Sequence, residues 1–131
     1  MFVIRILLCF VFCASWVFVP AYATKRKYSE AMYVDVWCRA QCGMQEFVNS
    51  DFTRVDCLTA RHAVEFDFAN KWAESIGQAL HYQLMTGKRA KVVLILERPE
   101  KQMVYFERVK KLAEIYDFDV EYVTPEIFCV K

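Results

Sequence analysis

Hydrophobic and polar positions follow two different periods along this chain. The helical period of about 3.6 residues predicts helices at residues 29–39, 70–86 and 99–116. Shorter apolar or alternating segments predict strands at residues 45–48, 53–58, 63–68, 91–96 and 120–123. A first half rich in hairpins, followed by the order α-β-α-β, indicates one α/β domain in which helices flank a mixed sheet.

The ends of these elements carry typical boundary residues. Ser29 opens the first expected helix and Gly43 would stop it. Asn70 is suited to cap the second helix, Gly87 to end it, and Pro99 to start the third.

Two of the expected strands differ in their pattern. Along residues 63–68, apolar side chains point to one face, and Glu65 and Asp67 point to the other. Residues 91–96 form a continuous apolar run, which is typical of a strand buried on both faces.

The N-terminal segment, residues 1–23, has the features of a signal peptide. A single positive charge, Arg5, precedes a long apolar run, and small residues end the segment at Ala23. Cleavage would leave residues 24–131 as one exported domain, periplasmic or secreted. The alternative is an uncleaved anchor, because residues 6–24 approach the roughly 20 residues that span a bilayer.

The net charge of the chain narrows the possible partners. The chain has 17 basic and 16 acidic residues, and Arg5 would leave with the leader, so the mature domain is balanced at 16 of each. This balance excludes avid polyanion binding by overall charge, and local basic clusters are either contact patches or solvated surface.

Four cysteines remain in the mature domain, Cys38, Cys42, Cys57 and Cys129. In an exported chain they predict disulfides rather than a zinc site, with three possible pairings.

Acidic residues gather on two neighbouring expected strands. Asp56 lies on the second strand, and Glu65 and Asp67 share one face of the third. If the two strands form a hairpin, their carboxylates meet and can bind a divalent cation that assists phosphodiester chemistry. The alternative is that these acids form the solvated face of the sheet.

The helix after these strands adds a second polar group. Lys71, Gln78 and Tyr82 lie within about 40° of one another on a helical wheel, starting three residues beyond the acidic strand. They either complete a site with the carboxylates or form an exposed helix face. Arg54 and Arg61 flank the acids and could contact phosphate or form surface ion pairs.

These residues occur in an order that resembles a known nuclease superfamily. The set Asp56, Glu65-Phe66-Asp67 and Lys71 resembles the PD-(D/E)xK motif. Residues 78–82 (QALHY) resemble the QxxxY motif of its RecB-like branch. A wider set is similar to small exported bacterial and phage-type members of the superfamily: Trp37-Cys38, 54–59, 63–68, 71–74 and 76–78.

The resemblance implies a restriction-endonuclease-like fold and a metal-dependent phosphodiesterase that acts on DNA. Asp56 and Glu65 would bind Mg²⁺ or Mn²⁺, and Lys71 would stabilise charge or activate water. Supporting polar roles fall to Glu46, Asp67, Gln78 and Tyr82. Cys38 and Cys57 are among the residues that carry the resemblance, which therefore implies a Cys38–Cys57 disulfide.

One position departs from the motif. Its lysine normally stands two residues after the second acid, where this chain has Asp67. Lys71 is therefore expected to replace that lysine from the neighbouring helix. If Lys71 does not reach the acids, the alternative is a non-catalytic binding module on the same scaffold, acting in the cell envelope.

Overall fold

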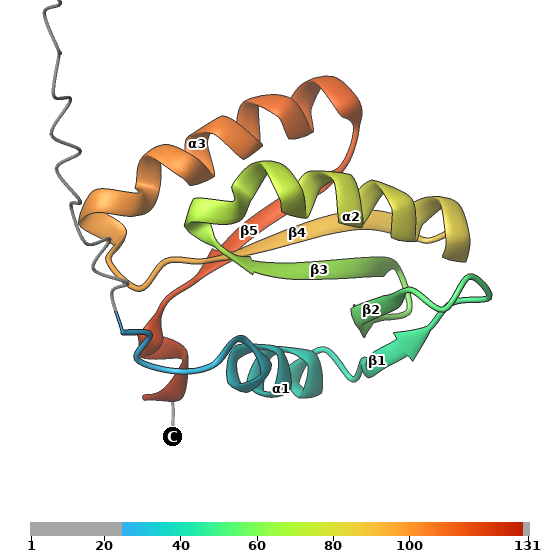
Figure 1. The fold of residues 1–131 in the computed structure, drawn as a ribbon, viewed down its shortest axis with the longest axis horizontal. Coiled ribbons are helices and arrows are strands. Elements are labelled where there is room, and N and C mark those ends of the chain that lie inside the picture. The colour runs from blue at the N-terminus through green and yellow to red at the C-terminus, as the bar shows by residue number, and fades with distance from the viewer. Residues whose placement is uncertain (1–24, 130–131) are drawn as a thin grey trace, which may run out of the picture.

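The computed structural model describes residues 25–129, and the predicted signal peptide, residues 1–23, lies outside this range. The main elements follow in the predicted order (Figure 1). Their bounds are α1 Glu30–Ala40, β1 Met44–Val48, β2 Arg54–Leu58, β3 His62–Phe68, η1 Ala69–Lys71, α2 Trp72–Thr86, β4 Arg89–Ile95, α3 Pro99–Tyr116, β5 Asp119–Val123 and η2 Pro125–Phe128, where η is a 3-10 helix. Within the described range, no helix is both long and apolar enough to cross a membrane.

The five strands form one mixed sheet in the order β1-β2-β3-β4-β5. Short turns connect β1, β2 and β3, which are antiparallel neighbours, whereas α2 and α3 provide the crossovers that make β3, β4 and β5 parallel. Strand β4 lies between two parallel neighbours, and most of its residues are buried, as its apolar run predicts. The predicted α/β class and mixed sheet are confirmed.

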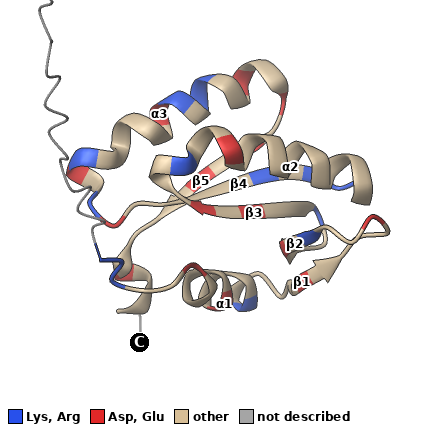
Figure 2. Ribbon diagram, viewed as in Figure 1, with Lys and Arg blue, Asp and Glu red and all other residues tan. Residues whose placement is uncertain are grey.

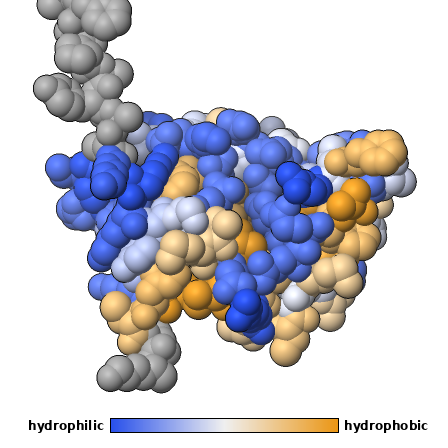
Figure 3. Space-filling model, turned by 60° about the horizontal axis from the view of Figure 1, so that its bottom comes forward, coloured by the Kyte–Doolittle hydropathy of each residue, from blue (hydrophilic) through white to orange (hydrophobic). Residues whose placement is uncertain are grey.

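Helices cover both faces of the sheet (Figure 1). On one face, α1 and η2 enclose an aromatic core that includes Tyr33, Trp37 and Phe66. On the other face, α2 and α3 cover a mainly aliphatic core around Val92 and Leu94. Seen from the α1 side, apolar and charged patches alternate on the surface (Figure 3).

Three predicted boundaries are wrong. Asn70 does not cap α2, because it lies in η1 and its side-chain oxygen accepts a hydrogen bond from Arg26 at 2.9 Å. Strand β4 begins at Arg89, two residues before the expected start. Gly43 does not stop α1, because the helix ends at Ala40, within one residue of the end that was expected at residue 39. Gly87 ends α2 in the left-handed conformation, as predicted.

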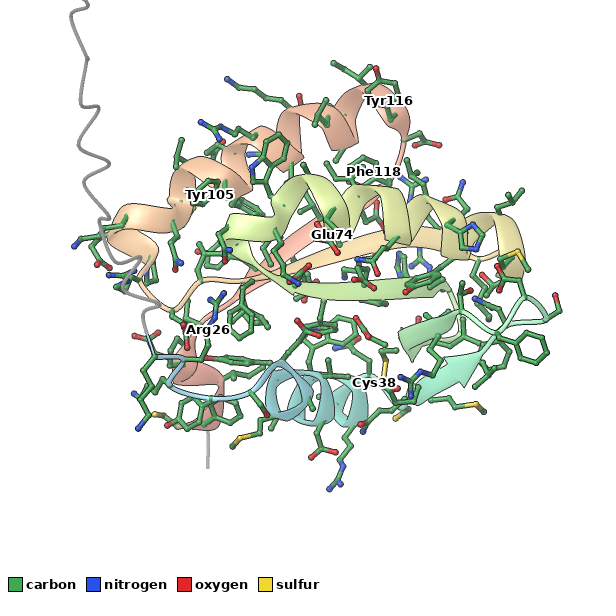
Figure 4. The ribbon with its side chains drawn as sticks, in the orientation of Figure 1. Arg26, Cys38, Glu74, Tyr105, Tyr116 and Phe118 are labelled. Carbon is green, nitrogen blue, oxygen red and sulfur yellow. A yellow bond between two sulfur atoms is a disulfide. The ribbon has the colours of Figure 1, made fainter. Side chains whose placement is uncertain are left out.

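The Cys38–Cys57 disulfide implied by the resemblance is present, and it joins α1 to β2. Figure 4 shows Cys38 between α1 and the sheet. Gly43 packs against this bridge so closely that a Cβ there would collide with both sulfur atoms. Gly43 is therefore required for space beside the disulfide. Cys42 and Cys129 are exposed free thiols.

Candidate functional site

Strands β2 and β3 separate partway along their length. Backbone pairing is limited to Cys57 with Val64 and Leu58 with Ala63. Continuing that register by one step places Asp56 opposite Glu65, but no ladder forms there. Instead, Asp56 Oδ2 accepts a hydrogen bond from the Phe66 backbone N–H at 2.7 Å. The Asp56 carboxylate thus replaces a backbone carbonyl as the acceptor for this N–H, and the two strands diverge beyond this point. We call this opening the β2–β3 fork.

A cleft of about 480 Å³ occupies this fork. Its lining contains all seven residues that the sequence predicts for a site: Glu46, Asp56, Glu65, Asp67, Lys71, Gln78 and Tyr82. It also contains residues that were not predicted as site residues: Glu30, Thr53, Phe66 and Glu74, with Arg54 beside them. The structure therefore brings the acidic strands and the polar stripe of α2 together in one place.

Glu65 is the most confined of the acidic residues. Glu65 is only 4% exposed, and its Oε2 is one of two buried side-chain polar atoms among residues 25–129 that have no hydrogen-bond partner. Burial, followed by the charge of Asp56, raises the pKa of Glu65 well above its usual range. A protonated Glu65 can donate to Asp56, which relieves the repulsion between them.

The pKa values of Asp56 and Asp67 are also raised by burial. Burial raises the pKa of Asp56, and the hydrogen bond from Phe66 N–H counteracts part of this rise. Burial likewise raises the pKa of Asp67, whereas Lys71 lowers it. Asp67 is 3% exposed and its Oδ1 accepts the Phe68 backbone N–H at 2.8 Å. The solvated-face interpretation of this strand is therefore wrong.

Glu30, at the start of α1, is one of the cleft residues that the sequence did not predict. Burial, and then the charges of Asp56 and Asp67, raise the pKa of Glu30 to about 7. In the sequence it is only the first acid of a helix, where an interaction with the helix dipole explains it fully. Its place in the cleft follows from the packing of α1 against the sheet, which no local pattern encodes.

Lys71 is held in the cleft by Asp67. Its Nζ lies 3.7 Å from Oδ1 of Asp67, which is four residues earlier in the chain on β3, and its side chain is 50% exposed. The lysine therefore pairs with the residue that stands at the usual lysine position of the motif. Its charge also lowers the pKa of Glu30, which places it within electrostatic reach of the carboxylates.

Tyr82 and Glu46 complete the wall around Glu65. Burial and the nearby Glu65 carboxyl raise the pKa of Tyr82, so its hydroxyl remains a neutral donor. Glu46 lies opposite Asp56 in the β1–β2 register and adopts a left-handed backbone conformation, φ 52°. A non-glycine residue in this region is strained, and such strain concentrates at functional sites. Glu46 also pairs with Arg54 at 3.1 Å.

The charge balance of the cleft differs from that of the whole domain. Six acidic residues line it, against two basic ones, Arg54 and Lys71. Figure 2 shows acidic positions on α1, β2, β3 and α2 near this opening.

Arg61 does not line this cleft, because it lines a separate hollow with His62 and Lys91. The expectation that Arg61 flanks the site is therefore wrong.

The carboxylates do not form a complete metal cage as they stand. In residues 25–129, no group of three or more His, Cys, Asp or Glu side chains is arranged to hold a metal ion. Mg²⁺ commonly binds through one or two carboxylates and keeps several waters or substrate oxygens as its other ligands. Two carboxylates, those of Asp56 and Glu65, meet this smaller requirement.

Comparison with models of known families, with characterised proteins and with solved structures finds no match.

Proposed function

We propose that this protein is an exported metal-dependent phosphodiesterase with a restriction-endonuclease-like fold that cleaves DNA. The observation that carries the proposal is the β2–β3 fork. There a buried Glu65 with an unpartnered oxygen lies opposite Asp56, beside Lys71. An uncompensated buried carboxyl is costly, so its retention favours a ligand that uses it.

Asp56 and Glu65 are the ligands for Mg²⁺ or Mn²⁺ in this proposal, and the orphan oxygen of Glu65 fits that role. When bound, the ion supplies a Lewis acid for the phosphodiester and a water of lowered pKa. The Phe66 backbone N–H fixes the orientation of Asp56. Tyr82 orients Glu65 through its hydroxyl, and Lys71 stabilises negative charge on the phosphate.

Two features outside the cleft support the wider proposal. The mixed sheet between helices agrees with the fold that the resemblance implies. The Cys38–Cys57 disulfide agrees with an oxidising compartment and hence with export through a cleaved leader.

The test is cleavage of DNA by the purified full chain with Mg²⁺ or Mn²⁺, with EDTA as the metal-free reference. Asp56→Asn and Glu65→Gln are each expected to lower the rate on the order of 100-fold or more. Glu114→Gln is the matched control, because Glu114 is exposed on α3 and outside the cleft. Equal cleavage by Glu65→Gln and Glu114→Gln would exclude this site.

A second function, a non-catalytic binding module, is favoured by one observation. Lys71 is half exposed and pairs with Asp67, so its charge is partly neutralised before any phosphate arrives. In that case DNA is not cleaved with either metal, and the Lys71→Met variant loses nothing. A rate loss of on the order of 100-fold in Lys71→Met, with metal binding retained in calorimetry, excludes the binding-module function.

A further inference from the structure

The turn between β1 and β2 presents an aromatic ring to solvent. Phe52 is 87% exposed, the largest exposed fraction among the exposed large hydrophobic residues of the described chain. Its backbone is left-handed, φ 68°, a conformation that is unfavourable for a bulky side chain. Both features cost free energy, because an exposed ring gains nothing from burial and the backbone is strained.

The turn is nevertheless held firmly. The Asn49 N–H donates to Thr53 O at 2.8 Å, and the Phe52 N–H donates to Asn49 O at 3.0 Å. Asp51 accepts from the Thr53 hydroxyl at 2.6 Å and pairs with His81 of α2 at 2.7 Å. These contacts fix the exposed ring relative to α2.

The residues that follow Phe52 in the chain lead directly into the proposed site. Thr53 and Arg54, the next two residues, line the cleft. His81 precedes Tyr82, which also lines it. Figure 1 shows the turn beside the C-terminal half of α2. The Arg54 guanidinium and the Phe52 ring thus belong to neighbouring residues at one edge of an acidic cleft.

We propose that Phe52 stacks against an unpaired base of the substrate while Arg54 contacts the neighbouring phosphate, so that the site prefers single-stranded nucleic acid or a single-stranded region. This inference rests on the proposed function, whose substrate class it narrows. Bases in single strands stack readily on exposed aromatic rings, whereas bases in a duplex are already stacked. Arg54 now pairs with Glu46 and would exchange that partner for phosphate.

The surroundings favour a nucleic-acid contact over a protein contact. The residues beside the ring in the chain are polar or charged: Ser50, Asp51, Thr53 and Arg54. Protein interfaces place an apolar centre inside a polar rim, whereas here polar turn residues separate the ring from the exposed Val48 of β1. Leu84, 80% exposed and three residues after His81, is the nearest exposed apolar residue along α2. The Leu84→Ala variant therefore tests the alternative that Phe52 and Leu84 form one apolar patch that binds a protein.

The experiment measures binding of the full chain to fluorescent single-stranded and duplex oligonucleotides by anisotropy, with Ca²⁺ in place of Mg²⁺. Phe52→Ala and Phe52→Gly are expected to weaken single-strand binding about 5- to 150-fold and duplex binding much less. Phe52→Trp should retain the affinity. Tyr116→Ala removes an exposed aromatic ring from the end of α3 and should change nothing (Figure 4).

Two further readouts separate stacking from a structural role. Glycine adopts positive φ without strain, so Phe52→Gly should melt no lower than the wild type while its affinity falls. A 2-aminopurine base in the single strand should be quenched by the wild type and by Phe52→Trp, but not by Phe52→Leu. Wild-type single-strand affinity in Phe52→Ala, or equal quenching by Phe52→Leu, would overturn the inference.

The outcomes also separate this inference from the proposed function. Metal-dependent cleavage that needs Asp56 but is the same in Phe52→Ala overturns the stacking alone. Binding that needs Phe52 without cleavage by Mg²⁺ or Mn²⁺ overturns hydrolysis alone. If the wild type neither binds nor cleaves, both fail. If Phe52→Ala and Leu84→Ala abolish self-association in ultracentrifugation and leave nucleic-acid binding intact, the turn is a protein contact and the stacking is excluded.

Discussion

The two faces of β3 are equally inaccessible to water and opposite in chemistry. Toward α1, Val64, Phe66 and Phe68 enter an aromatic core that the Cys38–Cys57 bridge closes. Toward α2, Glu65 and Asp67 are buried just as deeply, among other carboxylates. Burial stabilises the fold on the first face and costs free energy on the second.

This difference separates two tasks within seven residues of strand. The α1 face provides the stability that allows the α2 face to keep unfavourable charges in place. Proteins commonly carry such strained or unfavourable groups at functional sites and compensate for them elsewhere. Substitutions on the two faces are expected to change the stability of the fold in opposite directions.

The largest effect is expected on the stabilising face. Phe66→Ala removes a fully buried ring that contacts Trp37 edge-on, with centroids 5.4 Å apart. The free energy of unfolding should fall by about 3–5 kcal/mol, since truncation of a large core side chain also leaves a cavity. Chemical denaturation of the purified chain measures this loss. A loss below that of an exposed control such as Val104→Ala would show that the α1 face does not carry the stability.

Removing the disulfide should have the next largest effect. The bridge closes a loop with a sequence separation of 19 residues, for which loop entropy gives about 3 kcal/mol. The Cys38→Ser/Cys57→Ser double variant should therefore unfold at lower denaturant concentration. Reducing agent should lower the stability of the wild type and leave the double variant unchanged. Equal sensitivity of both proteins to reductant would mean that the reductant does not act through the Cys38–Cys57 bridge.

The architecture could be predicted well because it depends on local periods. The apolar run of β4 indicates its burial directly, and the alternation of β3 indicates which of its side chains pack against α1. Pro99 and Gly87 mark helix ends through backbone geometry that holds in any context. Asn70 failed as a cap because Arg26, 44 positions away in sequence, takes its side-chain oxygen. A contact of that kind has no local signature.

The sequence could predict those site residues that lie on elements next to one another in the chain. Asp56, Glu65 and Lys71 lie on neighbouring elements whose order fixes their meeting, so motif spacing was sufficient to group them. Glu30 was not predictable, since it reaches the cleft only through the tertiary position of α1. The strand fork itself depends on one side chain replacing a backbone acceptor, which periodicity does not reveal.

On the costly face the expected effect has the opposite sign. Glu65→Gln removes a buried carboxyl that lies against Asp56, so the metal-free protein should gain about 1–2 kcal/mol at pH 8. The same variant should lose affinity for Mn²⁺ in calorimetry. A Glu65→Gln protein less stable than the wild type at pH 8 would mean that the carboxyl contributes a needed hydrogen bond to the fold.

The smallest effect, and the sharpest in pH, belongs to Glu30. Its folded pKa, about 7, lies above its ordinary value of 4.5, so the folded state binds the proton more tightly than the unfolded state. Stability from this group is full below pH 4.5, is lost as the pH rises to 7, and stays lost above it. Glu30→Gln should therefore match the wild type at pH 4 and exceed it by about 1–2 kcal/mol at pH 8, after allowance for partial solvent screening. Denaturation at both pH values measures the difference, and Glu114→Gln, an exposed acid on α3, should show no such dependence. A constant offset at both pH values would attribute the gain to helix propensity and would remove Glu30 from the carboxylate cluster.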